Sequence, residues 1–404
     1  MPDIKLQSFE NQLNHELENI LSYWLTKTFD FKNEGYIGQI DFSEKQNFKA
    51  VKGSVLNARI LWTFSAAYQI FPNDRVLGGA KRAFDFIHKY CYSKNSGVYW
   101  SVTSEGKPFD SKNQIYALAF TIYGATEYYL ISKDERALDM AKDIFGLIQK
   151  HSYDKINGGY FEAFTADWKQ IEDLRLSDKD ANEKKTMNTH LHIVEAYTNL
   201  YKVWPNEDLK LAIIKLLKVI ETHFINHMSG HLKLFFDEEW NEKPDVISYG
   251  HDIEAAWLLL QCAEVTNEKD LIERYQKYAI LMADATFEGI DTNDGGLWYE
   301  YLPSEKMLIT EKHWWPQSEL LIGLFNAWEL TNDKKYLDAV YKNWEFIGNH
   351  ILDKKNGEWI WGINSDNTPI KKDKVGFWKC PYHNSRACIE ILKRIKKIEN
   401  EKAY

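Results

Sequence analysis

Cysteine is scarce in this chain, and its scarcity argues against two classes of protein. The four cysteines among 404 residues form no Cys-x-x-Cys pair, so neither a disulfide framework nor a zinc site is indicated. We expect free thiols in a reducing compartment. Proline is also rare, with 9 residues, and no Gly/Ser-rich stretch occurs, so the sequence shows no flexible linker or disordered tail.

A surplus of positive charge and a long apolar run are both lacking. The chain has 50 Lys and Arg against 59 Asp and Glu, so electrostatics gives no reason to expect nucleic acid or an anionic membrane surface as a partner. No apolar run approaches the roughly 20 residues that span a bilayer, and the start MPDIKLQSFENQL lacks the basic and apolar regions of a signal peptide. These features favour a soluble, cytoplasmic protein.

Aromatic residues, by contrast, are abundant. They make up 15% of the chain, with 15 Trp and 23 Tyr. Most of them are individually expected to fill the core. The excess nevertheless suits a carbohydrate ligand, because sugars stack their C–H faces on such rings.

A glycine followed by aromatic residues recurs six times along the chain. Consecutive occurrences lie 61 to 72 residues apart, and such a regular spacing indicates a repeated supersecondary unit. The six glycines are Gly35, Gly97, Gly158, Gly230, Gly295 and Gly357.

Helix-start signals fall between these glycines. Five polar turns, FPNDRVL, ISKDERAL, WPNEDLKL, TNEKDLIE and TNDKKYL, each offer a side chain suited to an N-cap before an apolar-periodic run. The pattern predicts that each unit has an amphipathic helix, a glycine-bearing loop and a more apolar helix. In the fourth unit we expect the helices at 207–228 and 251–266, the second apolar on nearly every side beyond its first turn.

Six such helix pairs can close into a ring, with the apolar helices inside and the amphipathic helices outside. We therefore predict an all-α fold, an (α/α)6 barrel of six helical hairpins that forms one domain over residues 1–404. Short β-hairpins or loops are expected at the end of the barrel where the inner helices begin.

Polar and aromatic side chains occupy the predicted starts of all six inner helices. Asn188 and His192 are four residues apart, and His251 and Glu254 are three apart, so each pair shares a helix face. Apolar residues would fill a barrel without a desolvation cost, so this polar ring predicts a polar ligand rather than a plugged core. The candidates are Arg59, Gln114, Tyr116, Asn188, His190, His192, His251, Glu254, Trp257, Trp314, Trp315, Gln317, Glu319, His383 and Arg386.

Four stretches resemble motifs of the cellobiose 2-epimerase family, within the N-acylglucosamine 2-epimerase superfamily. They are MNTHLHIVEAYTNLY, GHDIEAAWLL, EKHWWPQSELL and WKCPYHNSRACIE, and the similarity extends over essentially the whole chain. The superfamily has the (α/α)6 barrel that the repeat also predicts. The resemblance implies an isomerase that interconverts the reducing-end glucose and mannose units of β-1,4-linked disaccharides, cellobiose to glucosylmannose and also lactose to epilactose.

The resemblance also implies roles for individual residues. His251 and His383 would form the acid/base pair, and Arg59 would lie near O1 and O2 of the reacting unit. Trp315 and Trp378 would stack on the sugar rings. The residues expected to shape the pocket, hold hydroxyls or orient the histidines are Tyr116, Asn188, His192, Glu254, Trp257, Glu319 and Arg386. For His190, which points elsewhere on its helix, a structural and a ligand-binding role are both open.

The chemistry of C2 inversion accounts for two histidines. Ring opening gives an aldehyde that makes the C2 proton removable, and the resulting cis-enediolate is reprotonated on the opposite face. Histidine suits both steps because its ordinary pKa near 6.5 leaves either protonation state accessible at neutral pH. The proton leaves and returns, so we expect no cofactor, and no cluster of ligands around the His-x-x-Glu spacing indicates a metal.

Three alternatives differ in class. An N-acylglucosamine 2-epimerase or a mannose-type aldose-ketose isomerase would share the enediolate. A glycoside hydrolase would use two carboxylates, with Glu254 and Glu319 as candidates, and would leave His251 and His383 without a role. A non-catalytic sugar-binding protein would need the tryptophans but neither histidine. The oligomeric state is not determined by the sequence, although a monomer is favoured.

Overall fold

Twelve α-helices form the computed structural model, which describes residues 4–243 and 246–402. They alternate between an outer and an inner layer. The outer helices are α1 (Ile4–Lys27), α3 (Asp74–Phe86), α5 (Glu135–His151), α7 (Glu207–Val219), α9 (Lys269–Thr286) and α11 (Lys334–His350). The inner helices are α2 (Ser54–Tyr68), α4 (Ile115–Ser132), α6 (Met187–Val203), α8 (Tyr249–Thr266), α10 (Trp314–Thr331) and α12 (Tyr382–Lys402).

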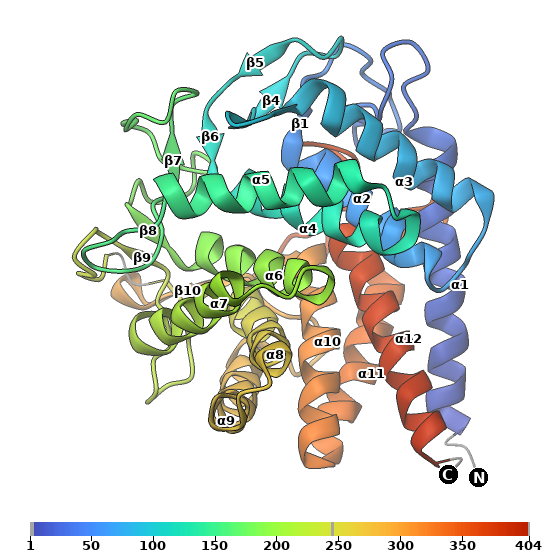
Figure 1. Cartoon of the computed structure of the whole chain (residues 1–404). Coiled ribbons are helices and arrows are strands. Elements are labelled where there is room, and N and C mark those ends of the chain that lie inside the picture. Colours follow the sequence, from blue (N-terminus) through green and yellow to red (C-terminus); the bar gives the residue numbers. More distant parts are fainter. Residues whose placement is uncertain (1–3, 244–245, 403–404) are drawn as a thin grey trace.

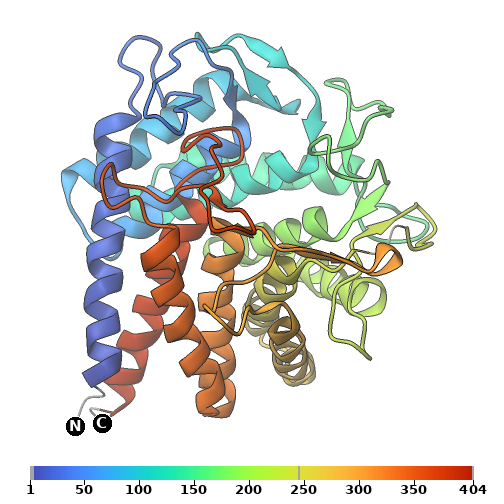
Figure 2. The same cartoon turned by 180° about the vertical axis from the view of Figure 1, so that it is seen from behind.

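The inner helices pack against one another in chain order, and α12 packs back against α2, so the ring is closed. The outer helix α1 lies beside α12 and joins the two ends of the chain (Figures 1 and 2). In α4, α8 and α10 nearly every residue is buried, whereas α5 and α11 bury one face only. The predicted all-α (α/α)6 barrel is therefore confirmed.

The predicted helix starts are mostly confirmed. The side chains of Asn73, Asp134, Asn206 and Asp333 accept hydrogen bonds from backbone amides in the first turns of α3, α5, α7 and α11. In TNEKDLIE the helix α9 begins in the predicted turn, but the expected cap is wrong, because the N-cap residue Glu268 makes no side-chain hydrogen bond to the helix.

Two helix boundaries in the fourth unit differ from the prediction. The helix expected at 207–228 is α-helical only to Val219, continues as a π-turn, Ile220–Phe224, and ends there. The inner helix α8 begins at Tyr249, two residues before the expected start. The earlier start makes His251 the third residue of the helix instead of the first.

Short strands tie the starts of the inner helices to neighbouring units. The strand before α4, β6 (Asn113–Gln114), pairs with β7 (Ala163–Phe164), and the strand before α10, β12 (Lys312–His313), pairs with β13 (Gly362–Ile363). The same arrangement joins β8 (Lys185–Thr186) to β9 (Phe235–Phe236), and β1 (Lys52–Gly53) to β4 (Ser101–Val102). The strand β4 pairs in turn with β5 (Pro108–Asp110). Local pairs are β2 (Tyr92–Ser93) with β3 (Gly97–Val98) and β10 (Glu300–Leu302) with β11 (Met307–Ile309).

Buried lysines fasten the glycine-bearing loops to the segments that precede the inner helices. In each case the ammonium group binds an aspartate of the loop at 2.7–2.9 Å and is almost fully buried. Repetition of one ion pair in four units shows that the loops share a construction despite different sequences. The pairs are Lys52–Asp30, Lys185–Asp154, Lys312–Asp291 and Lys374–Asp353.

The segment between α11 and α12 runs across the ring in Figure 2, where it is drawn in orange-red. It carries Trp361, Lys372 and Trp378 to the end of the barrel where the inner helices begin. Among the described residues, no helix is both long and apolar enough to cross a lipid bilayer.

Candidate active site

A cavity of about 310 Å³ lies at the starts of the inner helices. Nine of the twelve residues to which the family resemblance gave a role line it, which places residues from α2, α4, α6, α8, α10 and α12 around one space. These nine are Arg59, Tyr116, Asn188, His192, His251, Glu254, Trp315, Trp378 and His383.

Three histidines that line this cavity are each hydrogen-bonded to protein through Nδ1. His251 Nδ1 is hydrogen-bonded to the Ser248 hydroxyl at 2.8 Å. His192 Nδ1 lies 2.8 Å from Glu195 Oε2, and His383 Nδ1 lies 2.7 Å from Glu319 Oε1. Within the described chain none of the three Nε2 atoms has a hydrogen-bond partner. Because a carboxylate only accepts, Nδ1 of His192 and of His383 carries the proton in the neutral ring, and Nε2 is a proton acceptor. A serine hydroxyl can donate or accept, so the contact with Ser248 fits either tautomer of His251.

Burial keeps two of these imidazoles neutral. Desolvation, with a smaller contribution from the neighbouring His192, lowers the pKa of His251 to about 3. Desolvation also holds the pKa of His383 well below its ordinary value, assisted by the positive charges of Arg59 and Arg386. Both are bases at neutral pH, and negative charge developing on a bound molecule would favour their protonated forms.

Arg59 enters the cavity without a counter-ion. The guanidinium NH2 donates to the Tyr116 hydroxyl at 2.6 Å, and the group stacks 4.2 Å from the Phe120 ring centroid. Its Nε is buried without a partner, and no ion pair to it is found in the described part of the chain. Since a buried unpaired cation is costly, this arrangement suits a ligand that brings negative charge.

Arg386 lies behind the cavity and is paired with three carboxylates. Its guanidinium donates to Glu195 at 2.6 Å, to Glu319 at 2.7 Å and to Glu254. Glu319 also accepts from the Trp257 indole at 3.1 Å. Three predicted site residues, Trp257, Glu319 and Arg386, therefore do not line the cavity but orient residues that do.

Aromatic rings form the walls. The Trp315 ring centroid lies 4.8 Å from that of His251 and 5.7 Å from that of His383. Trp378 packs edge-on to Tyr116 at 6.0 Å. The two tryptophans expected to stack on sugar thus border the residues expected to do chemistry.

His190 is a structural residue. Its Nδ1 lies 2.7 Å from the Thr186 carbonyl oxygen, and its Nε2 accepts from the Tyr160 amide at 2.9 Å. A Cβ on Gly159, which has φ +76, would lie 2.8 Å from the same Nε2. The glycine signature of the third unit therefore makes room for His190.

Sequence reasoning missed one residue that its own spacing rule could have found. Glu195 is three residues after His192 on α6 and binds it directly. Most of the other missed lining residues are on loops far away in sequence, where no local pattern marks them; His313 differs, because it ends β12 directly before the candidates Trp314 and Trp315. These other residues are Leu176, Ser177, Lys179, Asp180, Tyr299, His313, Trp361 and Lys372.

One group of side chains has the composition of a metal site. Ligand atoms of Glu254, Glu319 and His383 lie within 4.8 Å of one another. The Arg386 guanidinium, however, already binds both carboxylates, and a permanent cation beside them opposes a second one. The expectation that no metal is needed stays a prediction.

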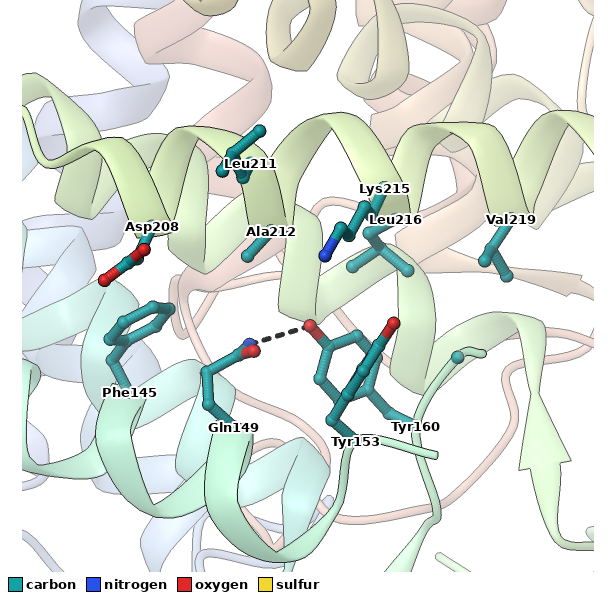
Figure 3. Close-up of a pocket in the computed structure, with 11 residues that line it drawn as sticks. Phe145, Gln149, Tyr153, Tyr160, Asp208, Leu211, Ala212, Lys215, Leu216 and Val219 are labelled. Atoms are coloured by element: carbon teal, nitrogen blue, oxygen red, sulfur yellow. Dashed lines mark hydrogen bonds between the residues drawn. The ribbon is translucent and has the colours of Figure 1, made fainter. Parts of the chain in front are cut away.

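A second hollow, of about 350 Å³, lies outside the ring between α5 and α7 (Figure 3). Its lining includes Phe145, Leu211 and Lys215, and the Gln149 amide donates to the Tyr160 hydroxyl beside it at 2.7 Å. It contains no histidine or arginine. Outer helices in a ring are spread more widely than inner ones, and this geometry accounts for the gap.

Comparisons with known proteins agree with the geometry. The family model N-acylglucosamine 2-epimerase (GlcNAc 2-epimerase) matches residues 35–387. A cellobiose 2-epimerase of Bacteroides fragilis is 42% identical, over 97% of this chain and 100% of that protein. One of Ruminococcus albus is 36% identical over 95% and 98%. The structure of cellobiose 2-epimerase from Bacillus thermoamylovorans superposes with a TM-score of 0.92 at 36% identity, over 96% and 100%.

Proposed function

The chain belongs to the N-acylglucosamine 2-epimerase family, and on that premise we propose that it is a cellobiose 2-epimerase. It converts cellobiose to glucosylmannose, and lactose to epilactose, by inverting C2 of the reducing-end unit. Relatives named for this activity cover nearly the whole chain. We also propose that residues 1–404 act as one catalytic domain, monomeric and cytoplasmic, in keeping with four buried free cysteines.

His251 and His383 are the acid/base pair. After ring opening, one Nε2 removes the C2 proton to give the cis-enediolate, and the other imidazole delivers a proton to the opposite face. Both imidazoles line the cavity with Nδ1 bound to protein and Nε2 without a partner in the described chain, which supports this assignment. Positioned proton transfer of this kind contributes about 10²- to 10⁴-fold to the rate.

Arg59 stabilises the enediolate. A permanent cation without a carboxylate partner is available to the oxygen on which negative charge develops. In a water-poor cavity, one such preorganised donor is worth about 3 kcal/mol of barrier.

The remaining predicted residues bind or position. Trp315 and Trp378 provide stacking surfaces, and Tyr116, Asn188 and Glu254 can hold hydroxyls. Glu319 and Arg386 act from behind by fixing the ring of His383.

A single observation carries the proposal: imidazoles from different inner helices, each bound through Nδ1 and without a partner at Nε2 among the described residues, line a cavity that also holds a guanidinium without a counter-ion. Hydrolysis is less well supported. Its candidate carboxylates, Glu254 and Glu319, are both bound by Arg386, and Glu319 does not line the cavity. A sugar-binding protein would not need three oriented histidines.

The substrate panel is the direct test. The protein is incubated separately with cellobiose, lactose, mannose and N-acetylglucosamine, and the products are identified by NMR. We expect glucosylmannose and epilactose from the disaccharides. Preferential conversion of N-acetylglucosamine, or of mannose to fructose, would favour the sister activities, and glucose released from cellobiose would indicate a hydrolase.

A further inference from the structure

One buried carboxylate is bonded to both ends of the segment that carries Trp378 and His383. It is that of Glu358, which belongs to the chain between α11 and α12 that crosses the ring in Figure 2, and its residue is 1% exposed. Oε1 accepts from Lys379 Nζ at 2.8 Å and from Asn384 Nδ2 at 2.6 Å. Lys379 follows Trp378 in the chain, and Asn384 follows His383. The carboxylate therefore binds the direct neighbour of each of these two cavity residues.

The two donors are themselves fully buried. Lys379 and Asn384 are both 0% exposed, and Lys379 Nζ lies 5.2 Å from the ring centroid of Trp314, which lines the cavity. A buried ammonium group cannot leave its carboxylate without a large desolvation cost. A change at Glu358 is therefore transmitted to the segment that contains both donors.

The joint between loop and inner helix is built differently in this unit. In three other units a backbone amide of the glycine-bearing loop donates directly to a side chain in the first turn of the inner helix. In the sixth unit the Trp359 amide donates to Glu358 at 2.9 Å, and Asn384 in the first turn of α12 donates to the same oxygen. Glu358 therefore stands between a loop and a helix that are bonded directly elsewhere. The direct bonds run from Tyr160 to His190, from Leu232 to Asp252 and from Leu297 to Gln317, at 2.7–2.9 Å.

The backbone at Glu358 is unfavourable for a glutamate. Its φ is +64, in the left-handed region that glycine adopts readily. In each loop the carbonyl oxygen at this position accepts from the amide of the loop's aspartate, and the equivalent residues of the first and third units are Gly35 and Gly159, with φ +60 and +76. The sixth unit keeps a side chain where the backbone favours none, which indicates a use for the carboxylate.

We infer that Glu358 is a positioning residue for both the base His383 and the stacking ring of Trp378; this inference rests on the proposed function. Glu358 does not line the cavity and touches no substrate. Through Asn384 it holds the first turn of α12, which carries His383, and through Lys379 it holds the residue next to Trp378. Proton transfer at C2 depends on close placement of the base, so this carboxylate sets the rate as well as the preference for disaccharides.

Glu358→Gln tests the inference, because glutamine keeps the size of the side chain but not its charge. The Trp24 indole of α1 also donates to the carboxylate, at 2.6 Å. The single amide oxygen cannot serve this indole and the segment at once, and Lys379 loses its counter-charge. We expect kcat for cellobiose to fall at least about tenfold, because a small misplacement of a base is costly. The ratio of kcat/KM for cellobiose to that for mannose should narrow about 2- to 10-fold, the size of a lost aromatic contact.

Glu16→Gln is the control for the chemical change. Glu16 of α1 accepts from the Trp359 indole at 2.8 Å, so it joins the same two segments, but in the described chain it has no hydrogen bond to Lys379 or Asn384. Burial raises the pKa of Glu16 to about 7, so a neutral amide is a close substitute at neutral pH. We expect this variant to keep the wild-type kcat and the wild-type ratio of cellobiose to mannose.

Trp24→Phe is the control for lost stability. It removes the indole on the α1 side of Glu358 and leaves the bonds to Lys379 and Asn384 in place. Urea unfolding measures how much free energy of unfolding this variant and Glu358→Gln each lose. We expect Trp24→Phe to be less stable than the wild type and to keep its kcat.

Two further variants remove one donor each, so the test does not depend on the folding of Glu358→Gln. Asn384→Ala should lower kcat for cellobiose and mannose by a similar factor, because it releases the turn that carries His383. Lys379→Met should lower kcat/KM for cellobiose more than for mannose, because it releases the residue next to Trp378.

Several outcomes would overturn the inference. They are wild-type kcat in Glu358→Gln, an equal loss of activity in Trp24→Phe or Glu16→Gln, and an unchanged ratio of cellobiose to mannose in both Glu358→Gln and Lys379→Met. If Glu358→Gln does not fold, wild-type kinetics in both single-donor variants would overturn it. A wild-type protein that epimerises no disaccharide would instead refute the proposed function.

Discussion

The two buried arginines at the starts of the inner helices have opposite surroundings. Arg386 donates to three glutamates on α6, α8 and α10, whereas Arg59 has a tyrosine hydroxyl and aromatic rings but no carboxylate in the described chain. Both side chains are nearly inaccessible to solvent. A buried cation that is paired with carboxylates holds those carboxylates in place. A buried cation without a carboxylate partner is stabilised when a ligand brings negative charge. This difference assigns Arg386 to the scaffold that positions the site, and Arg59 to the part of the site that acts on the ligand.

The largest effect should come from removing either of the two proposed bases, of which His383 is held by Glu319 of the Arg386 cluster. His251→Ala and His383→Ala should each lose about 10²- to 10⁴-fold in kcat, because neither base can reach the other face of C2. Steady-state kinetics with cellobiose measures this, with His227→Ala, at an exposed position, as the control. Either active-site variant keeping more than about a tenth of wild-type activity would refute the two-histidine assignment.

Arg386→Met should break the scaffold. Three buried carboxylates would lose their shared cation, and breaking a buried pair on one side costs about 3–5 kcal/mol. Urea unfolding gives the change in the free energy of unfolding. Arg394→Met is the comparison, since Arg394 pairs with Glu329 at a partly exposed position and such pairs contribute about 0–1 kcal/mol. Equal losses of unfolding free energy in the two variants would mean that Arg386 stabilises the protein no more than a partly exposed arginine does.

Arg59→Met should lower the activity without lowering the stability, which is the reverse of the behaviour expected for Arg386→Met. We expect a stability equal to or above that of the wild type, because an unpaired buried charge is removed, and a fall in kcat of about 10²- to 10³-fold. Arg82→Met is the control, since Arg82 stacks on Phe29 at 4.7 Å away from the cavity. A destabilised Arg59 variant with normal kcat would assign this arginine to the scaffold.

Trp378→Ala tests whether the binding site extends beyond the reacting sugar unit. Aromatic contacts add about 0.5–1.5 kcal/mol beyond buried area, so kcat/KM for cellobiose should fall more than that for mannose. Wild-type protein should prefer the disaccharide clearly. Trp344→Ala, on the outer surface beside Gln12, should leave kcat/KM unchanged for both cellobiose and mannose. A parallel fall for both sugars would mean that Trp378 contacts only the reacting unit.

The smallest effect is expected from chelators. Arg386 already neutralises the Glu254 and Glu319 carboxylates, so EDTA should leave the turnover of cellobiose unchanged. Activity that disappears in EDTA and returns with a divalent ion would show that the carboxylate cluster binds a metal.

The parts of the site that repeat could be predicted from the sequence. The regular glycine spacing predicted the barrel, and helix periodicity placed Asn188 with His192 and His251 with Glu254, because residues three or four apart share a face. The scaffold was harder to foresee. That Glu319 orients His383 from another helix, and that Lys179, Tyr299 and Lys372 reach the cavity from separate loops, depends on tertiary packing that no local pattern encodes.

Capping shows the same limit at a smaller scale. Asn206 and Glu268 both precede outer helices in similar polar turns, yet only the shorter asparagine side chain caps its helix. Asn267, one residue earlier, ends α8 with φ 59, so one short turn must close one helix and start the next. The sequence pattern locates such a turn, but it does not show which residue ends the first helix and which residue caps the second.

The central claim is that the protein moves the C2 proton through solvent-exchanging histidines. Cellobiose incubated with the wild-type protein in deuterated water tests it most directly, with deuterium at C2 of the product read by NMR. The account predicts glucosylmannose that carries deuterium at C2. Glucosylmannose that retains the original C2 hydrogen would contradict it.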